Sequence, residues 1–173
     1  MATVLEILKK YTQVAPVDVD AVAKELGIHV VRDYLVGISG KIQKDSRGKY
    51  TIVVNASDAP SRQRFTIAHE IAHFLYHRDL IGDGVSDSPA YRSPDERVYD
   101  NTPLEKRHEV QANQFAANLL MPKELVRSLE MHFPGLSDAE LADRLGVSLP
   151  AFRVRKGLPP YPDAQEAFGA VNA

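Results

Sequence analysis

One short segment, residues 65–76, constrains the fold of this chain more than any other. Its apolar side chains fall on almost every face of a helix, and among them stand His69, Glu70 and His73. A helix that is apolar nearly all round is buried, so these three polar side chains must find partners inside the protein. The segment therefore predicts a buried helix, running to about His77, that carries a functional cluster.

The spacing of the two histidines has a direct chemical interpretation. Residues four apart lie one turn apart on the same helix face, so His69 and His73 can bind one metal ion. Glu70 is offset by about 100° and can instead take a proton from an attacking water. The alternative is a helix whose histidines merely bond to neighbouring groups, and it is disfavoured because buried polar groups need specific partners. We therefore predict a metal site with Glu70 as the catalytic base.

A zinc site of this kind needs a third protein ligand and one open position. His77 is excluded, because His69, His73 and His77 would spread over about 12 Å of helix axis at about 1.5 Å per residue. The metzincin arrangement needs a histidine where this chain has Asp79. The third ligand is therefore expected from another element.

A second amphipathic helix, predicted over residues 104–120, offers that ligand. Its polar stripe consists of Arg107, Gln111, Gln114 and Asn118. Glu109 and Asn113 lie instead on its apolar face, where a carboxylate is costly unless it is paired. We predict Glu109 as the third metal ligand and Asn113 as the residue that holds a ligating imidazole in the correct tautomer. Glu105 and His108 are the alternatives to Glu109.

Composition limits the metal and the setting. The chain has no cysteine, which excludes thiolate ligands and disulfides and fits a cytoplasmic protein. Two imidazoles and one carboxylate suit Zn²⁺, and they also accept Mn²⁺. The net charge of −2 gives no general attraction for nucleic acid, and no apolar run is long enough to cross a bilayer. The N-terminal segment lacks the features of a secretory signal.

The other segments predict an α+β fold with a small sheet. Strands are expected at 28–31, 38–44 and 49–55, the last two joined by a hairpin turn at 45–48. Further helices are expected at 3–13, 18–26, 123–131, 137–145 and 148–156, with a long loop over 79–102. Ser57 or Ser61 is the expected cap of the histidine-bearing helix. The predicted organisation is a metallopeptidase domain over 1–131, a helical unit over 132–160 and a tail over 161–173.

Two stretches resemble the signature sequences of the ImmA/IrrE family of metallopeptidases. Residues 64–74, RFTIAHEIAHF, resemble its active helix, and residues 109–122, EVQANQFAANLLMP, resemble its second signature. The resemblance implies a small gluzincin-like α+β domain with Glu109 as third ligand. It also implies a substrate, a bacterial repressor of the phage type, cut at one site to release stress, prophage or mobile-element genes.

Two further features leave alternatives open. Residues 137–155 look like a helix-turn-helix, and the cations that follow its turn, Arg153, Arg155 and Lys156, could contact phosphates. A DNA-binding regulator, or a member of a toxin–antitoxin module, is therefore a rival to the endopeptidase, although the chain is slightly acidic. A donor for the oxyanion of the reaction could come from any of five side chains. These are Tyr76, His77, His108, Tyr91 and Tyr99.

Overall fold

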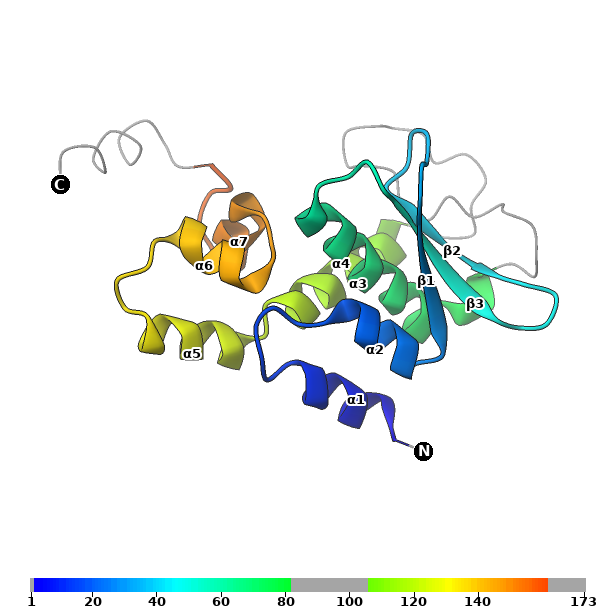
Figure 1. The fold of residues 1–173 in the computed structure, drawn as a ribbon, viewed down its shortest axis with the longest axis horizontal. Helices are drawn as coiled ribbons and strands as arrows, with labels where there is room; N and C mark the ends of the chain where they lie inside the picture. Colours follow the sequence, from blue (N-terminus) through cyan, green and yellow to red (C-terminus); the bar gives the residue numbers. More distant parts are fainter. Residues whose placement is uncertain (1, 82–105, 162–173) are drawn as a thin grey trace.

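The computed structural model describes residues 2–81 and 106–161, which form an α+β fold (Figure 1). The strands are β1 (Ile28–Asp33), β2 (Gly40–Lys44) and β3 (Tyr50–Asn55). The helices are α1 (Val4–Tyr11), α2 (Val19–Glu25), α3 (Pro60–Tyr76), the single 3-10 turn η1 (Arg78–Leu80), α4 (Lys106–Leu120), α5 (Lys123–His132), α6 (Asp138–Leu145) and α7 (Leu149–Arg155). The predicted elements within these ranges are confirmed, with ends that differ by a few residues.

The three strands form one mixed sheet in the order β1-β3-β2. The predicted hairpin is present, since β2 and β3 pair antiparallel and Asp45 donates its backbone N–H to the Lys49 carbonyl (2.9 Å). β1 pairs parallel to β3, which puts the last strand of the sequence in the middle of the sheet. Residues 52–54 of β3 are buried accordingly.

Helix α3 contacts β2 and β3 and also packs against α4. Residues 66–74 of α3 are all buried, as the sequence predicts for a helix that is apolar nearly all round. Gly40 lets β2 approach this helix, because a Cβ there would collide with the Thr66 side chain and the Val53 carbonyl. Helix α3 thus packs closely against β2, the first strand of the hairpin.

The predicted cap of α3 is wrong. The helix begins at Pro60, after Ala59, and no side chain in the described part of the chain caps it, so neither Ser57 nor Ser61 has that role. Proline at the first helical position has no N–H that needs a partner and has a φ suited to the helix, which lowers the need for a cap.

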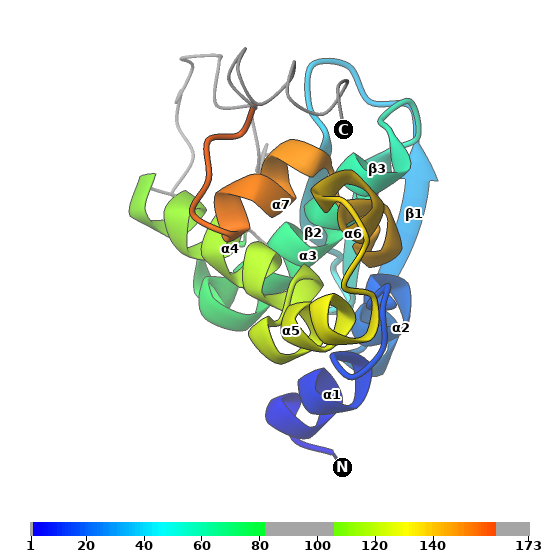
Figure 2. The same ribbon diagram turned by 90° about the vertical axis from the view of Figure 1, so that its left-hand side faces the viewer.

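The C-terminal helices share the core of the rest of the chain. Leu145 and Phe152 are fully buried in the same apolar cluster as Ile67 of α3. Arg64 of α3 adds a polar link, donating through Nε to the Gly146 carbonyl between α6 and α7 (3.1 Å). Helix α7 lies beside α4, as Figures 1 and 2 show. The boundaries proposed at 131 and 160 stay predictions.

Within the described residues, no helix combines the length and the apolar character needed to cross a membrane.

Candidate metal centre

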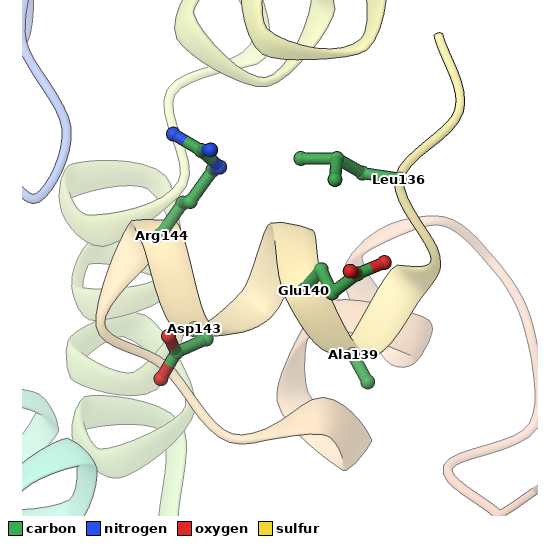
Figure 3. A pocket seen from close by; sticks show the side chains of 5 residues that line it. All are labelled: Leu136, Ala139, Glu140, Asp143 and Arg144. Carbon is green, nitrogen blue, oxygen red and sulfur yellow. The ribbon is translucent and has the colours of Figure 1, made fainter. Parts of the chain in front are cut away.

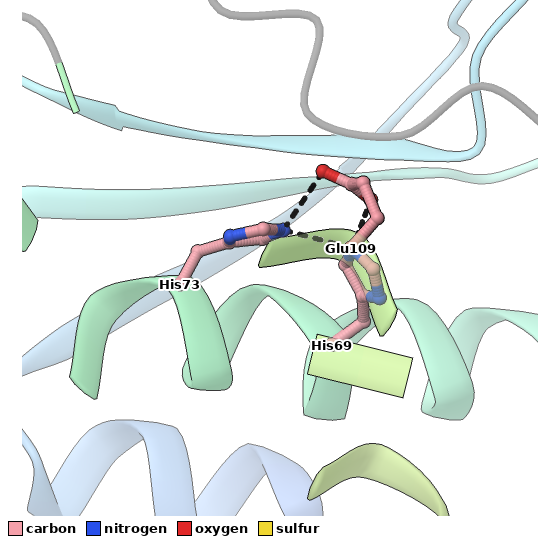
Figure 4. Close-up of side chains that lie close together, drawn as sticks. All are labelled: His69, His73 and Glu109. Atoms are coloured by element: carbon pink, nitrogen blue, oxygen red, sulfur yellow. Dashed lines mark hydrogen bonds and ion pairs between the residues drawn. The ribbon is translucent and has the colours of Figure 1, made fainter. Parts of the chain in front are cut away.

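Helices α3 and α4 bring three metal-ligating side chains together (Figure 4). His69 and His73 are fully buried, and their Nε2 atoms lie 2.9 Å apart. Glu109 Oε2 lies 3.2 Å from His69 Nε2, and Glu109 Oε1 lies 3.5 Å from His73 Nε2. Ligands bound at about 2.0–2.2 Å in a tetrahedral zinc site are about 3.3–3.5 Å apart, so this triangle has nearly the required size.

Asn113 determines which nitrogen of His69 carries the proton. Its Oδ1 lies 3.0 Å from His69 Nδ1. An amide oxygen only accepts, so His69 Nδ1–H is the donor and Nε2 keeps its lone pair. The sequence predicted this contact for Asn113, one turn after Glu109 on α4.

His73 is oriented through a longer chain of hydrogen bonds. Gln111 Oε1 accepts from His77 Nε2 (3.1 Å), which leaves a lone pair on His77 Nδ1. That nitrogen lies 3.0 Å from His73 Nδ1 and accepts its proton in a hydrogen bond. His73 therefore also presents the lone pair of Nε2 to the centre of the site.

The residues present fit a divalent cation. Two imidazole lone pairs and one carboxylate point at one another in a mostly buried space, and such a group of electron-pair donors is unfavourable without a positive charge among them. Burial, reinforced by neighbouring histidines, lowers the pKa of His73 to about 2. The ring is therefore neutral and able to bind a metal near neutral pH. The donor set matches Zn²⁺ and is also compatible with Mn²⁺.

Glu70 is buried beside this triangle. Desolvation raises its pKa well above the usual range, and the charge of Glu109 raises it further, while the Ile42 backbone N–H offsets part of the shift. Neither carboxylate oxygen has a partner within hydrogen-bonding geometry among residues 2–81 and 106–161. A buried acid that has no side-chain partner among the described residues and lies next to candidate metal ligands has the properties of a group kept for proton transfer.

The sequence comparisons agree with this geometry. Residues 23–155 match the family model Peptidase_M78, described as the IrrE N-terminal-like domain. The chain belongs to this family. It is also 43% identical over 101 residues to the radiation response metalloprotease IrrE of Deinococcus deserti, covering 57% of this chain and 33% of that protein. It is 36% identical over 99 residues to the IrrE of Deinococcus radiodurans, covering 56% of this chain and 27% of that one.

This IrrE-like chain therefore spans about a third or less of the length of these two relatives. A solved structure, a Mycobacterium tuberculosis transcriptional regulator, is similar with a TM-score of 0.52 and 20% identity, covering 92% of this chain and 47% of that chain. At that identity the likeness shows the fold alone.

The other candidates of the IrrE-like site have different placements. His77 is buried and both its ring nitrogens face other side chains, so it lies beside the metal ligands without joining them. Tyr76 is 52% exposed and packs edge-on against Phe115. The ring of His108 lies 4.7 Å from that of His77. Glu105, Tyr91 and Tyr99 lie outside the described residues.

The pairing of His77 with Gln111 is a contact that the sequence does not predict. Gln111 was placed on the polar stripe of its helix, where a glutamine is unremarkable. The available signal was the spacing of His77, one turn beyond His73 on the same face, which places the two rings next to each other.

Proposed function

We propose that this chain is a zinc-dependent endopeptidase with a small gluzincin-like domain, which cuts one peptide bond in a bacterial phage-type transcriptional repressor. Cleavage would release stress, prophage or mobile-element genes, and such a substrate implies a cytoplasmic location. The observation that carries the proposal is a buried Glu70, with no side-chain partner among the described residues, beside three converging ligand side chains. The names of the two Deinococcus relatives support a metalloprotease, and the repressor follows from the family resemblance.

In this mechanism His69, His73 and Glu109 hold the metal, and Asn113 keeps the ring of His69 in its binding tautomer. A zinc ion held there would supply Lewis-acid chemistry, making water more acidic and the scissile carbonyl more electrophilic. Glu70 takes the proton of the attacking water on a carboxylate oxygen and delivers it to the nitrogen of the departing amine. A cation held beside it would keep Glu70 ionised and able to accept that proton, and its desolvated position would help it hold the proton between the two steps.

The direct test is cleavage of candidate repressors by the purified chain with Zn²⁺ or Mn²⁺, with the fragments read by mass spectrometry. Glu70→Gln should lower the rate by about 10²–10⁴-fold or more, because general-base catalysis is lost, while the metal content stays unchanged. Glu124→Gln, at an exposed position on α5, is the matched control and should cleave normally. Undiminished cleavage by Glu70→Gln would refute the role of Glu70. Metal binding without cleavage of any repressor would refute the proposed substrate class.

The DNA-binding alternative finds little support in the contacts of α7. Arg153 donates to the Pro159 carbonyl (2.8 Å), and Arg155 donates to the Met121 carbonyl (3.1 Å). Lys156 forms ion pairs with Asp138 and Glu130 at 2.8 and 3.3 Å. The three cations proposed to contact phosphates are thus engaged within the chain.

The neighbouring surface of α6 also gives little support for DNA binding (Figure 3). A hollow of about 460 Å³ there is lined by Leu136, Ala139, Glu140, Asp143 and Arg144. It contains two carboxylates, and its one guanidinium stacks on the Phe133 ring at 4.2 Å. A gel shift with the metal-free protein at low salt separates the hypotheses, since a DNA-binding module should shift fragments there and the endopeptidase should not. A role in a toxin–antitoxin module would keep the same site and change only the partner.

A further inference from the structure

A third histidine, His77, directly follows the last residue of α3; it lies one turn beyond His73 and is buried against it. We propose that His77 and Gln111 are positioning residues that fix the proton of His73 on Nδ1 and so keep Nε2 available for the metal. This inference rests on the metal site of the proposed function but not on cleavage or on the repressor. It assigns a role to a histidine that is too far along the helix to be a ligand.

The contacts of His77 leave little room for another role. One ring nitrogen faces His73 Nδ1 at 3.0 Å, and the other faces Gln111 Oε1 at 3.1 Å. A third ligand histidine would turn a nitrogen toward His69 and Glu109, and His77 turns both elsewhere. Any buried histidine needs hydrogen-bond partners, so the role depends on which atoms these are, and one of them is a ring nitrogen of the candidate ligand His73.

Gln111 sets the direction of this chain of hydrogen bonds. An imidazole pair joined through Nδ1 atoms can carry the shared proton on either ring, and the two arrangements are equivalent unless something else distinguishes them. The amide oxygen of Gln111 requires a proton on His77 Nε2, so His77 Nδ1 must accept. Without that oxygen, His77 could donate from Nδ1, and His73 would then carry its proton on Nε2, in the place of the metal.

Helix α4 therefore supplies more than a ligand. Within two turns it carries Glu109, which faces the metal site, and two amides that determine the tautomers of the α3 histidines. Asn113 acts on His69 directly, whereas Gln111 acts on His73 through His77. Because partners of ligating histidines typically change metal affinity by about 10–100-fold, both amides should affect metal binding.

The test measures Zn²⁺ affinity by competition with a chromophoric chelator. His77→Phe keeps a ring but removes the acceptor, and should weaken Zn²⁺ binding by about 10–100-fold. Gln111→Met keeps the length of the side chain and removes its oxygen. It should weaken binding by about 5–10-fold, because water can take the vacant place but can also donate, and so does not fix the proton. Gln114→Met, at another exposed glutamine of α4, is the matched control and should bind like the unaltered protein.

A spectroscopic measurement tests the same idea without metal. In the metal-free protein, ¹⁵N shifts of the histidine rings should show His73 protonated on Nδ1 and His77 on Nε2, and Gln111→Met should convert part of His73 to the Nε2–H form. The inference is overturned if Gln111→Met binds Zn²⁺ as tightly as Gln114→Met, or if His73 of the unaltered protein carries its proton on Nε2. If His77→Phe does not fold, the exposed Gln111 position still decides the question. Tight Zn²⁺ binding without peptidase activity would refute the proposed function and leave this inference intact.

Discussion

The α3–α4 pair and the α6–α7 pair are both helix pairs with a buried interface, but they differ in whether their polar groups have local hydrogen-bond partners. α3 begins without a side-chain cap and has four fully or almost fully buried polar side chains along one stretch. Among the described residues, four buried side-chain atoms lack a hydrogen-bond partner, and three of them belong to Thr66 and Glu70 of α3. The fourth belongs to Asp58, just before the helix.

The α6–α7 pair satisfies its polar groups locally. Ser137 and Glu140 form a capping box at the start of α6, Gly146 ends that helix in the left-handed conformation, and Ser148 caps α7. The buried Arg153 donates to a backbone carbonyl. Sequences usually break local rules where function requires it, so the difference between the pairs locates the active region in α3 and α4 and marks α6–α7 as a supporting unit.

The largest effect on folding should come from Gly146→Ala, which tests whether α6–α7 is a supporting unit. Gly146 has φ +66°, and an added Cβ would lie 2.6 Å from Arg64 Nε. The left-handed backbone alone costs about 1–2 kcal/mol for alanine. Displacing Arg64 also weakens its bonds to the Gly146 and Val17 carbonyls, each worth about 1 kcal/mol. We expect a total loss of about 2–4 kcal/mol in the free energy of unfolding, measured by urea denaturation.

Gly157→Ala is the matched control for this change. Gly157 also has a positive φ, +76°, but no atom of the described residues lies within 4 Å of an added Cβ. Gly157→Ala should lower the free energy of unfolding only by the backbone contribution of about 1–2 kcal/mol. Equal losses at the two glycines would show that the Arg64 link contributes nothing, and the α6–α7 pair would then be held by apolar packing alone.

A second prediction concerns the opposite property of α3, a polar group that weakens the fold. The pKa of Glu70 is raised in the folded state, so below the unfolded value of 4.5 both states hold the proton and stability is unaffected. As pH rises from 4.5 through the folded pKa, the unfolded state releases its proton first and stability falls. Glu70→Gln removes this loss, and we expect it to stabilise the metal-free protein by on the order of 1 kcal/mol or more at pH 8, and by less at pH 5.

Thermal unfolding in the presence of a chelator measures this difference, with the exposed Glu124→Gln as control at both pH values. A stabilisation that does not change between pH 5 and pH 8 would mean that the ionisation of Glu70 is not its source. Added Zn²⁺ should reduce the advantage of glutamine, because a nearby cation stabilises the carboxylate.

The two regions also show what the sequence can and cannot predict. Spacing alone placed His69 and His73 on one helix face, and the apolar face of α4 singled out Glu109, because helix periodicity fixes which residues share a face. The hairpin and both C-terminal helices were predicted as well, because the sequence signals for turns and helices are local. Apart from the contact of Asn113 with a ligating imidazole, the partners of polar side chains were not predicted.

Long-range partners depend on how elements pack, and spacing within one element does not contain that information. The link from Arg64 to Gly146 joins residues 82 positions apart, and that from His77 to Gln111 joins residues 34 apart. The parallel pairing of β1 with β3 is likewise a property of the assembled sheet. The basic residues after the α6–α7 turn looked available for phosphates because their acceptors lie on other segments.

The smallest expected effect separates the capped helix from the uncapped one. Ser137→Ala removes both hydrogen bonds of the α6 capping box that use the serine hydroxyl, and should cost about 0.5–2 kcal/mol. Ser61→Ala, in the first turn of α3, should change stability by less than about 0.5 kcal/mol, because that helix starts on Pro60 and takes no side-chain cap. Urea denaturation of the two variants measures the difference. A loss at Ser61 equal to that at Ser137 would mean that α3 depends on local capping after all, and that its stability does not come from burial between the sheet and α4.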